Sequence, residues 1–205
     1  MPTTIRNRLI ALKRYRRHLL LGIAIAAIGA GVYLILLIYV FPHRDPIPKS
    51  TYQAIIQKDY TKVRSKPDKR LIIPSIGVQA DIIADNLKLL DKGYIIQRSK
   101  SGGNPVTGGN FVLTGHRFMF GLTPQRVRQN SVLFDLDKVK VGDKIALFWE
   151  HKLYTYSVKR LYKVKPESIG IESPSTESKL TIYTCTLGGT YDGRLVLEAF
   201  PSTAQ

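Results

Sequence analysis

The chain has 205 residues, of which 44% are hydrophobic, and it carries a formal net charge of +16. This length suffices for one ordinary domain and an appendage, and the apolar content excludes an intrinsically disordered chain. The single cysteine, Cys185, excludes an intramolecular disulfide and argues against a cysteine-based zinc site. The charge has two sources: residues 1–18 carry six cations and no acid, and the remainder carries 25 basic and 15 acidic residues.

Residues 19–41 form an apolar stretch of 23 residues without a charged side chain. At about 1.5 Å per residue, a helix of this length spans roughly 34 Å, which is enough to cross a hydrocarbon core of about 30 Å. The basic residues directly before it predict a cytoplasmic tail over 1–18 and a chain that is extracellular beyond the span. We therefore expect a single-pass protein of the cell membrane. Topology explains the first cluster of charges, so a nucleic-acid partner is not needed.

A cleaved signal peptide is the alternative interpretation, and the small residues Ala24, Ala26 and Ala27 favour it. The apolar region of a signal peptide runs about 7–15 residues, and cleavage here would leave further apolar residues at the new N-terminus. An uncleaved transmembrane helix therefore fits better. Three prolines follow the apolar stretch, and we expect residues 42–69 to form an extracellular stalk with one short helix around 52–63.

From residue 70 onward the pattern changes to short apolar runs that are rich in β-branched and aromatic residues and are separated by turn residues. These runs are RLIIPSIGV, QADII, NFVLTG, KIALFWE, KLYTYSVKRLYKV, KLTIYTC and RLVLEAF. Helical signals are weak, with one turn expected at 131–138. About 135 residues of mostly antiparallel strands are too many for a flat sheet, so we predict a mostly β domain over 70–205 that closes into a small barrel.

Cys185 ends one of these runs and enters a loop that contains two glycines. A lone cysteine in a folded domain is usually an inert buried residue, but the end of a strand places it at a rim. A nucleophilic thiolate needs access to solvent and a nearby positive charge. Arg194 begins the next run, nine residues later. If the two runs are neighbouring strands, Arg194 returns to Cys185 and can stabilise a thiolate or a developing oxyanion.

His116 ends another strand-like run and follows Gly115, which permits the backbone to bend and the ring to point out of the sheet. Taken alone, this histidine is weak evidence for a site. The other histidines are weaker candidates. His18 and His43 flank the apolar stretch as interfacial residues would, and His151 lies in an expected hairpin turn.

Together these residues resemble the sortase family. The segment Thr181-Ile182-Tyr183-Thr184-Cys185 is similar to the family signature TLxTC, with Ile in place of Leu. Thr114-Gly115-His116-Arg117 is similar to the Gly-His segment of the family, and Arg194 to its essential arginine. The resemblance covers roughly residues 70–201, including LIIPSIGV and LFDLDKVKVGDKI. The Gly-His-Arg form and the short loop between Cys185 and Arg194 resemble the housekeeping-type sortases of classes D and E.

This resemblance implies a closed eight-stranded sortase-type β-barrel with short helices, and a transpeptidation outside the cell. Cys185 would attack the Thr–Gly carbonyl of an LPxTG-like sorting signal on a surface protein, and His116 would protonate the leaving amine. Arg194 would hold the oxyanion. The amine acceptor would be peptidoglycan, its precursor or a pilin lysine. Gly115 would shape the backbone, and Thr184 would either form a hydrogen bond beside the nucleophile or belong to the core.

The chemistry implied by the resemblance requires no nucleotide, metal or redox cofactor. Calcium activation, as in the family, stays an open alternative that no acidic cluster in the sequence supports. The long segment 118–130 contains Arg126 and Arg128 and either lines the substrate entrance or is a solvated loop.

Two other functions compete with that of a sortase. An L,D-transpeptidase or papain-like hydrolase is disfavoured, because a Cys-x-Arg segment is missing and His116 precedes Cys185. An anchored extracellular module that binds anionic cell-wall polymers would explain the charge but not the three candidate site residues.

Overall fold

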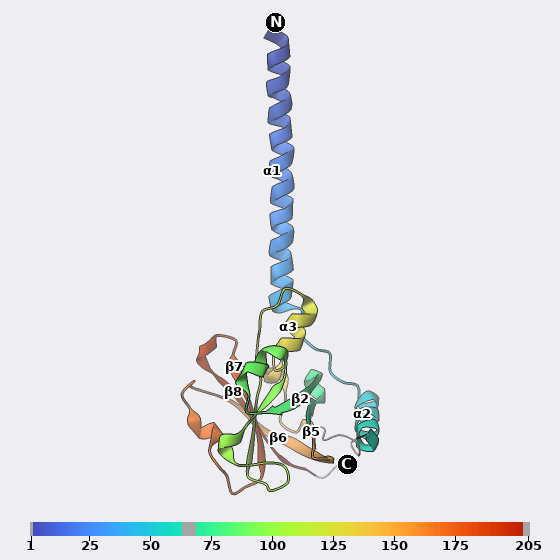
Figure 1. Ribbon diagram of the computed structural model, residues 1–205, viewed down its shortest axis with the longest axis vertical. Helices are drawn as coiled ribbons and strands as arrows, with labels where there is room; N and C mark the ends of the chain where they lie inside the picture. The colour runs from blue at the N-terminus through green and yellow to red at the C-terminus, as the bar shows by residue number, and fades with distance from the viewer. Residues whose placement is uncertain (1, 63–68, 203–205) are drawn as a thin grey trace.

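The structure is a computed structural model that describes residues 2–62 and 69–202. A long helix projects from a compact β domain, and the C-terminal end of this helix lies against the domain (Figure 1). The helices are α1 (Pro2–Tyr39), α2 (Lys49–Lys62) and α3 (Pro124–Asn130). The strands are β1 (Arg70–Ile73), β2 (Val78–Ala84), β3 (Ile95–Arg98), β4 (Asn110–Thr114), β5 (Lys144–Trp149), β6 (Lys152–Val164), β7 (Lys179–Thr186) and β8 (Gly189–Pro201). Short 3-10 helices lie at η1 (Pro74–Ile76), η2 (Leu87–Lys92), η3 (Ser99–Ser101), η4 (Leu136–Lys138) and η5 (Ile169–Glu172).

The strands close into an eight-stranded barrel in the order β1-β2-β3-β4-β7-β8-β6-β5, which confirms the predicted fold class. Six of the eight strand pairs are antiparallel, but β2 pairs with β3, and β4 with β7, in parallel. Strand β3 did not stand out in the sequence as a separate run. The parallel pair β4–β7 has a consequence for the site, because the C-terminal ends of these two strands lie at the same end of the barrel.

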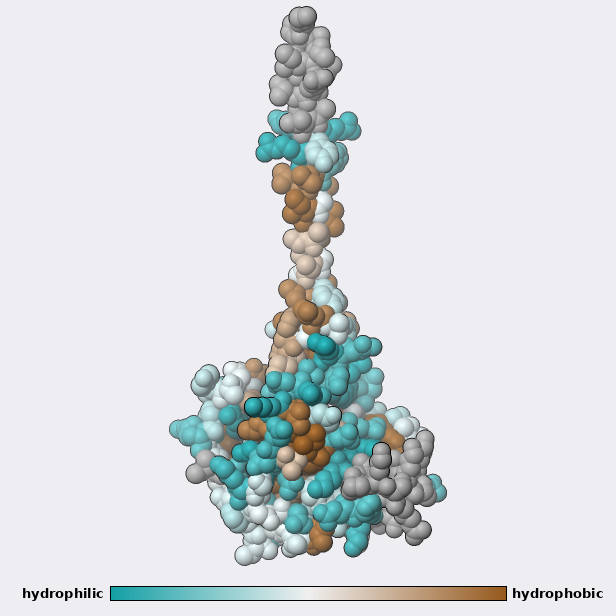
Figure 2. Space-filling view, viewed as in Figure 1, coloured by the Kyte–Doolittle hydropathy of each residue, from teal (hydrophilic) through white to brown (hydrophobic). Residues whose placement is uncertain are grey.

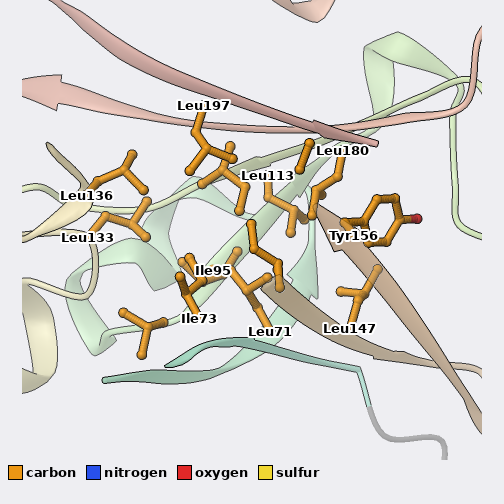
Figure 3. Close-up of a cluster of buried hydrophobic side chains, with 14 of the residues drawn as sticks. Leu71, Ile73, Ile95, Leu113, Leu133, Leu136, Leu147, Tyr156, Leu180 and Leu197 are labelled. Carbon is orange, nitrogen blue, oxygen red and sulfur yellow. The ribbon is translucent and has the colours of Figure 1, made fainter. Parts of the chain in front are cut away.

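Alternate residues of the strands fill the inside of the barrel, as the period of two in a β-strand requires. Figure 3 shows this core, in which side chains from β1, β3, β4, β5, β6, β7 and β8 meet Leu133 and Leu136, at and just before the start of η4. The labelled core residues include Leu71, Ile95, Leu113, Leu180 and Leu197, each with none of its surface exposed. The opposite faces of β4, β7 and β8 therefore point away from the core, and the candidate site residues lie on or beside that outer face.

Helix α1 is the one helix within the described residues that is long and apolar enough to cross a membrane, over Lys13–Tyr39. Figure 2 shows hydrophobic side chains along the projecting part of α1, bounded on the N-terminal side by a band of hydrophilic residues. Leu37, near the C-terminal end of the helix, is buried against the domain. The helix thus continues into the folded domain without an intervening spacer.

The described part of the segment expected as a stalk, 42–62, does not hold the domain away from α1. Residues Ile47, Tyr52, Ile55 and Ile56, on and just before α2, pack against buried side chains on the outside of β1 and β5. Before α2, His43 contacts Asp135 through Nδ1 at 2.6 Å, so this histidine packs on the domain. Apolar side chains along the segment explain the difference, because they are better buried on the barrel than exposed on a free linker. The remainder of the predicted stalk, 63–68, lies outside the described residues.

Candidate active site

Cys185 and Arg194 face each other across a tight hairpin. Strands β7 and β8 are antiparallel neighbours, and Cys185 is the register partner of Arg194. Directly opposite residues of an antiparallel pair project from the same face, with Cβ atoms about 4.5–5.5 Å apart. A β-bulge follows Cys185, and the strand turns back between Thr186 and Gly189. The free thiol is partly exposed, as a nucleophile at the rim of a sheet must be.

The guanidinium of Arg194 is held by its own hairpin. Its Nη1 donates to the carbonyl oxygen of Thr190 at 2.8 Å and to that of Gly193 at 3.1 Å. Both acceptors lie in the same hairpin, so the side chain is held against the turn that joins β7 and β8. A guanidinium has five N–H donors, and the ones not bound to these carbonyls can serve a substrate.

His116 reaches the same end of the barrel from β4. Thr114, the last residue of β4, is the parallel register partner of Tyr183, which lies two residues before Cys185. Two residues further along each chain bring His116 to the level of Cys185. The carbonyl of His116 accepts a hydrogen bond from the backbone N–H of Leu133 at 3.0 Å, which fixes the chain as it leaves the strand.

A buried hydrogen bond joins the residues that precede the histidine and the cysteine. The hydroxyl of Thr184 donates to the carbonyl oxygen of Gly115 at 2.7 Å, and 1% of Thr184 is exposed. The bond therefore links two segments that are 69 residues apart in the sequence. Of the two roles left open for Thr184, the structure shows both: it is buried, and it forms a hydrogen bond beside the nucleophile.

Gly115 is required for close packing rather than for a special backbone angle. A Cβ atom at this position would lie 2.8 Å from Cδ1 of Ile95 and 3.1 Å from Cδ1 of Leu133. Its backbone does not have the positive φ that seven other glycines of the described chain have. A side chain here would require the Ile95 and Leu133 side chains, or the segment that carries His116, to shift.

A family model described as a sortase domain matches residues 71–202. The chain belongs to the sortase family. Among curated relatives, Sortase A of Streptococcus agalactiae is 37% identical over 87 residues, which cover 40% of this chain and 33% of that protein. Sortase A of Bacillus anthracis is 26% identical over 118 residues, which cover 57% of this chain and 50% of that protein. The chain thus aligns with a third to a half of the length of these two relatives.

A solved structure supports the fold of this sortase. It is that of a Clostridium perfringens Sortase D5 transpeptidase, with a TM-score of 0.55, 22% identity, and coverage of 72% of this chain and 89% of that one. At this level of identity the likeness concerns the fold. It agrees with the closed barrel, while the roles of individual residues depend on the geometry of this chain.

Below Cys185, the outer face of the sortase barrel carries a polar network. The Tyr183 hydroxyl donates to Oε1 of Glu172 at 2.5 Å, and Nε of Arg98 donates to the same oxygen at 2.9 Å. Burial and then the hydrogen bond to Glu172 raise the pKa of Tyr183 to about 12. Burial alone would raise the pKa of Glu172, but the hydrogen bonds from Arg98 and Tyr183 outweigh it and lower this pKa. These fixed charges hold the segment with η5 over β7, next to the candidate nucleophile.

Sequence reasoning missed a carboxylate that contacts the histidine. Nε2 of His116 lies 2.8 Å from Oδ1 of Asp91, the penultimate residue of η2. In the sequence, Asp91 is part of Asp-Lys-Gly, which predicts only a turn. The side chain of Asp91 is 70% exposed and that of His116 is 24% exposed, so the pair lies at the surface and differs from a fully buried catalytic carboxylate–histidine pair.

The segment 118–130 after His116 is more ordered than the expected loop. Its second half forms α3, which begins at Pro124 and is capped by Thr123, whose hydroxyl accepts a hydrogen bond from the Arg126 N–H. Arg117, directly after the histidine, is buried and pairs with Asp137 at 2.7 Å. This arginine therefore anchors the segment to η4 and does not line an entrance.

The described residues contain no group of three or more His, Cys, Asp or Glu that could hold a metal ion.

Proposed function

We propose that this sortase is a membrane-anchored cysteine transpeptidase. It would cleave an LPxTG-like sorting signal between Thr and Gly, and transfer the acyl group to an amine of peptidoglycan or a pilin. The observation that supports the proposal is the strand register of a chain of the sortase family. Cys185 is the register partner of Arg194, and Thr114, two residues before His116, is the partner of Tyr183, two residues before Cys185.

Each of the three candidate catalytic residues would have a separate role in this reaction. The Cys185 thiolate attacks the carbonyl carbon of the Thr–Gly bond, and a C–S bond forms while the carbonyl oxygen becomes an oxyanion. Arg194, with its free N–H donors, stabilises this negative charge. When the C–N bond breaks, His116 gives a proton to the leaving glycine amine, and a thioester remains. The acceptor amine then attacks the thioester, gives a proton back to His116, and releases the thiolate.

The same proposal places the protein in the cell membrane with its N-terminus in the cytoplasm and its barrel outside the cell. Support comes from the apolar helix over Lys13–Tyr39 and from the cations that precede it in the sequence. The partners are then surface proteins with a C-terminal sorting signal. The short Cys185–Arg194 hairpin and the Gly-His-Arg segment favour a class D or E type of sortase.

The test uses the full chain in detergent micelles with a quenched LPxTG-type peptide and an amine acceptor. Wild type should cleave the peptide, form the amide product and give a covalent acyl adduct by mass spectrometry. Cys185→Ala should form no adduct, and His116→Ala and Arg194→Ala should lose most of the turnover. Lys152→Ala is the surface control and should match wild type. Lys152 is the first residue of β6, and the opposite end of β6 is the one that pairs with Arg194.

Equal turnover by wild type and Cys185→Ala would refute the assignment of the nucleophile. Tight binding to anionic cell-wall polymers without any acyl adduct would instead support the anchored binding module. These two outcomes separate the enzyme from its non-enzymatic alternative.

A further inference from the structure

Helix α1 and the segment that follows His116 are in direct contact. The hydroxyl of Tyr33 donates to the carbonyl oxygen of Leu122 at 2.8 Å. Nearer the end of the helix, Leu37 is buried, and Nε of Arg128 donates to the carbonyl of Phe41 at 3.3 Å. Figure 1 shows the chain that enters α3 rising beside the C-terminal end of α1. This hydrogen bond therefore fixes Leu122 beside Tyr33 along the length of α1.

This contact lies within the part of α1 that must cross the membrane. From Leu19 to Tyr33 the helix rises only about 22 Å, which is short of a hydrocarbon core of about 30 Å. Counted from Leu19, such a core extends to about Ile38, more than one turn beyond Tyr33. Tilt of the helix would require still more residues. Because Cβ atoms on a helix lean toward its N-terminus, the Tyr33 side chain does not shift the contact out of the membrane.

The segment 118–123 carries exposed apolar side chains, which suit a position within the apolar layer of the membrane. Phe120 and Leu122 are 47% and 76% exposed in the absence of lipid. The hydroxyl of Tyr33 satisfies the Leu122 carbonyl, which would otherwise lack a donor in an apolar layer. Directly behind this segment, Arg126 and Arg128 on α3 are exposed, and residues 116–134 contain no Asp or Glu. Apolar tips flanked by cations suit the boundary between acyl chains and anionic headgroups.

We propose that residues 118–123 form a membrane-docking loop, whose Phe120 and Leu122 insert into the outer leaflet while Arg126 and Arg128 face lipid phosphates. The inference rests on the anchored topology of the proposed function, but it does not depend on the transpeptidase chemistry. The loop begins two residues after His116, so docking would hold the end of the barrel that carries His116 and Cys185 at the lipid surface. Substrates that are themselves attached to the membrane would then reach the site without leaving that surface.

The test exploits the single cysteine of the chain. In full-length Cys185→Ala protein, Leu122→Cys and Val106→Cys each introduce one thiol for an environment-sensitive fluorophore. Val106 is 53% exposed and precedes β4, so it lies at the opposite end of that strand and serves as the matched control. Both proteins are reconstituted in phosphatidylglycerol and phosphatidylcholine vesicles that carry a nitroxide quencher on the upper acyl chain.

The label at position 122 should lose most of its fluorescence and shift to the blue, and the label at 106 should not change. Phe120→Cys provides a second position in case the Leu122→Cys protein does not fold, and it should behave in the same way. Equal, weak quenching at 106, 120 and 122 in protein that resists carbonate extraction would overturn the docking loop while leaving the anchor intact. Extraction of the chain by carbonate would overturn the anchor and the docking loop together. Because the variants lack the thiol of Cys185, none of these outcomes depends on whether the chain is a transpeptidase.

Discussion

The hydrogen bond from Thr184 to Gly115 provides the sharpest test of how the site is held together. Thr184→Val preserves the volume and the β-branched shape but removes the hydroxyl. The buried carbonyl of Gly115 then loses this donor at 2.7 Å, and leaving a buried polar group unsatisfied costs about 1–3 kcal/mol. We therefore expect the melting temperature to fall by several degrees. Thr184→Ser retains the hydroxyl and should lose less stability.

The same bond should also matter for catalysis, because it fixes the two segments that carry the sulfur and the imidazole. A misplacement of 1 Å between reacting groups can reduce a rate by about 100-fold. We expect kcat/KM of Thr184→Val to fall by about 10- to 100-fold, measured at 25 °C on protein that is fully folded by circular dichroism. Thr184→Ser should stay within about fivefold of wild type. A Thr184→Val protein with wild-type melting temperature and wild-type kcat/KM would refute the reasoning.

Three further substitutions test the surroundings of the site. Asp91→Asn should reduce kcat/KM at most about fivefold, because an exposed ion pair contributes about 0.2–1 kcal/mol, and a hundredfold loss would mean that Asp91 acts with His116 as a catalytic pair. Gly115→Ala should lower the free energy of unfolding by about 1–3 kcal/mol in chemical denaturation, since its Cβ would lie 2.8 Å from Ile95; unchanged stability would mean that the contact is relieved at no cost. Burial alone would raise the pKa of Glu198, but hydrogen bonds from Arg160 and Lys179 outweigh it and lower this pKa. The stability that Glu198 contributes is therefore present above the pKa it has in the unfolded chain, and it is lost as pH falls through the lower folded pKa. Glu198→Gln should be less stable than wild type at pH 7 and should lose less stability between pH 7 and pH 3. The same fall in melting temperature between pH 7 and pH 3 for both proteins would contradict this.

Local pattern predicted much of the barrel and one half of the site. Seven apolar runs with β-branched residues correspond to strands of the structure. Some, such as β4 and β5, are buried on both faces and give continuous apolar runs, while β2 alternates between buried and exposed residues. The neighbourhood of Cys185 and Arg194 could also be predicted, since a short hairpin brings nearby residues together. The length of the apolar stretch similarly predicted α1.

What could not be predicted depends on contacts between distant segments. The parallel pairing of β4 with β7 has no local signal, so it could not be derived from the sequence that the segments carrying His116 and Cys185 leave the barrel at the same end. Asp91 resembled any turn-forming aspartate, and its partner is 25 residues away. The packing of α2 on the barrel was missed because its apolar residues are spaced among polar ones, which also suits an exposed linker.

Because the described part of the segment expected as a stalk packs on the barrel, the reaction would take place closer to the membrane than a free linker would allow. An extended linker over 42–69 could have carried the barrel up to about 90 Å from the lipid surface. Instead, Tyr33 holds Leu122, and the six residues from His116 to Leu122 can span at most about 22 Å. If the chain is anchored as proposed, the candidate acid–base residue therefore stays within about 22 Å of Leu122, which is itself hydrogen-bonded to Tyr33 on the membrane-spanning helix. A sorting signal whose own membrane segment follows closely would be within reach, whereas one on a long tether would gain nothing from this arrangement. In such an anchored protein, the position of the site relative to the membrane would be set by the contact between Tyr33 and Leu122 and not by the length of a linker.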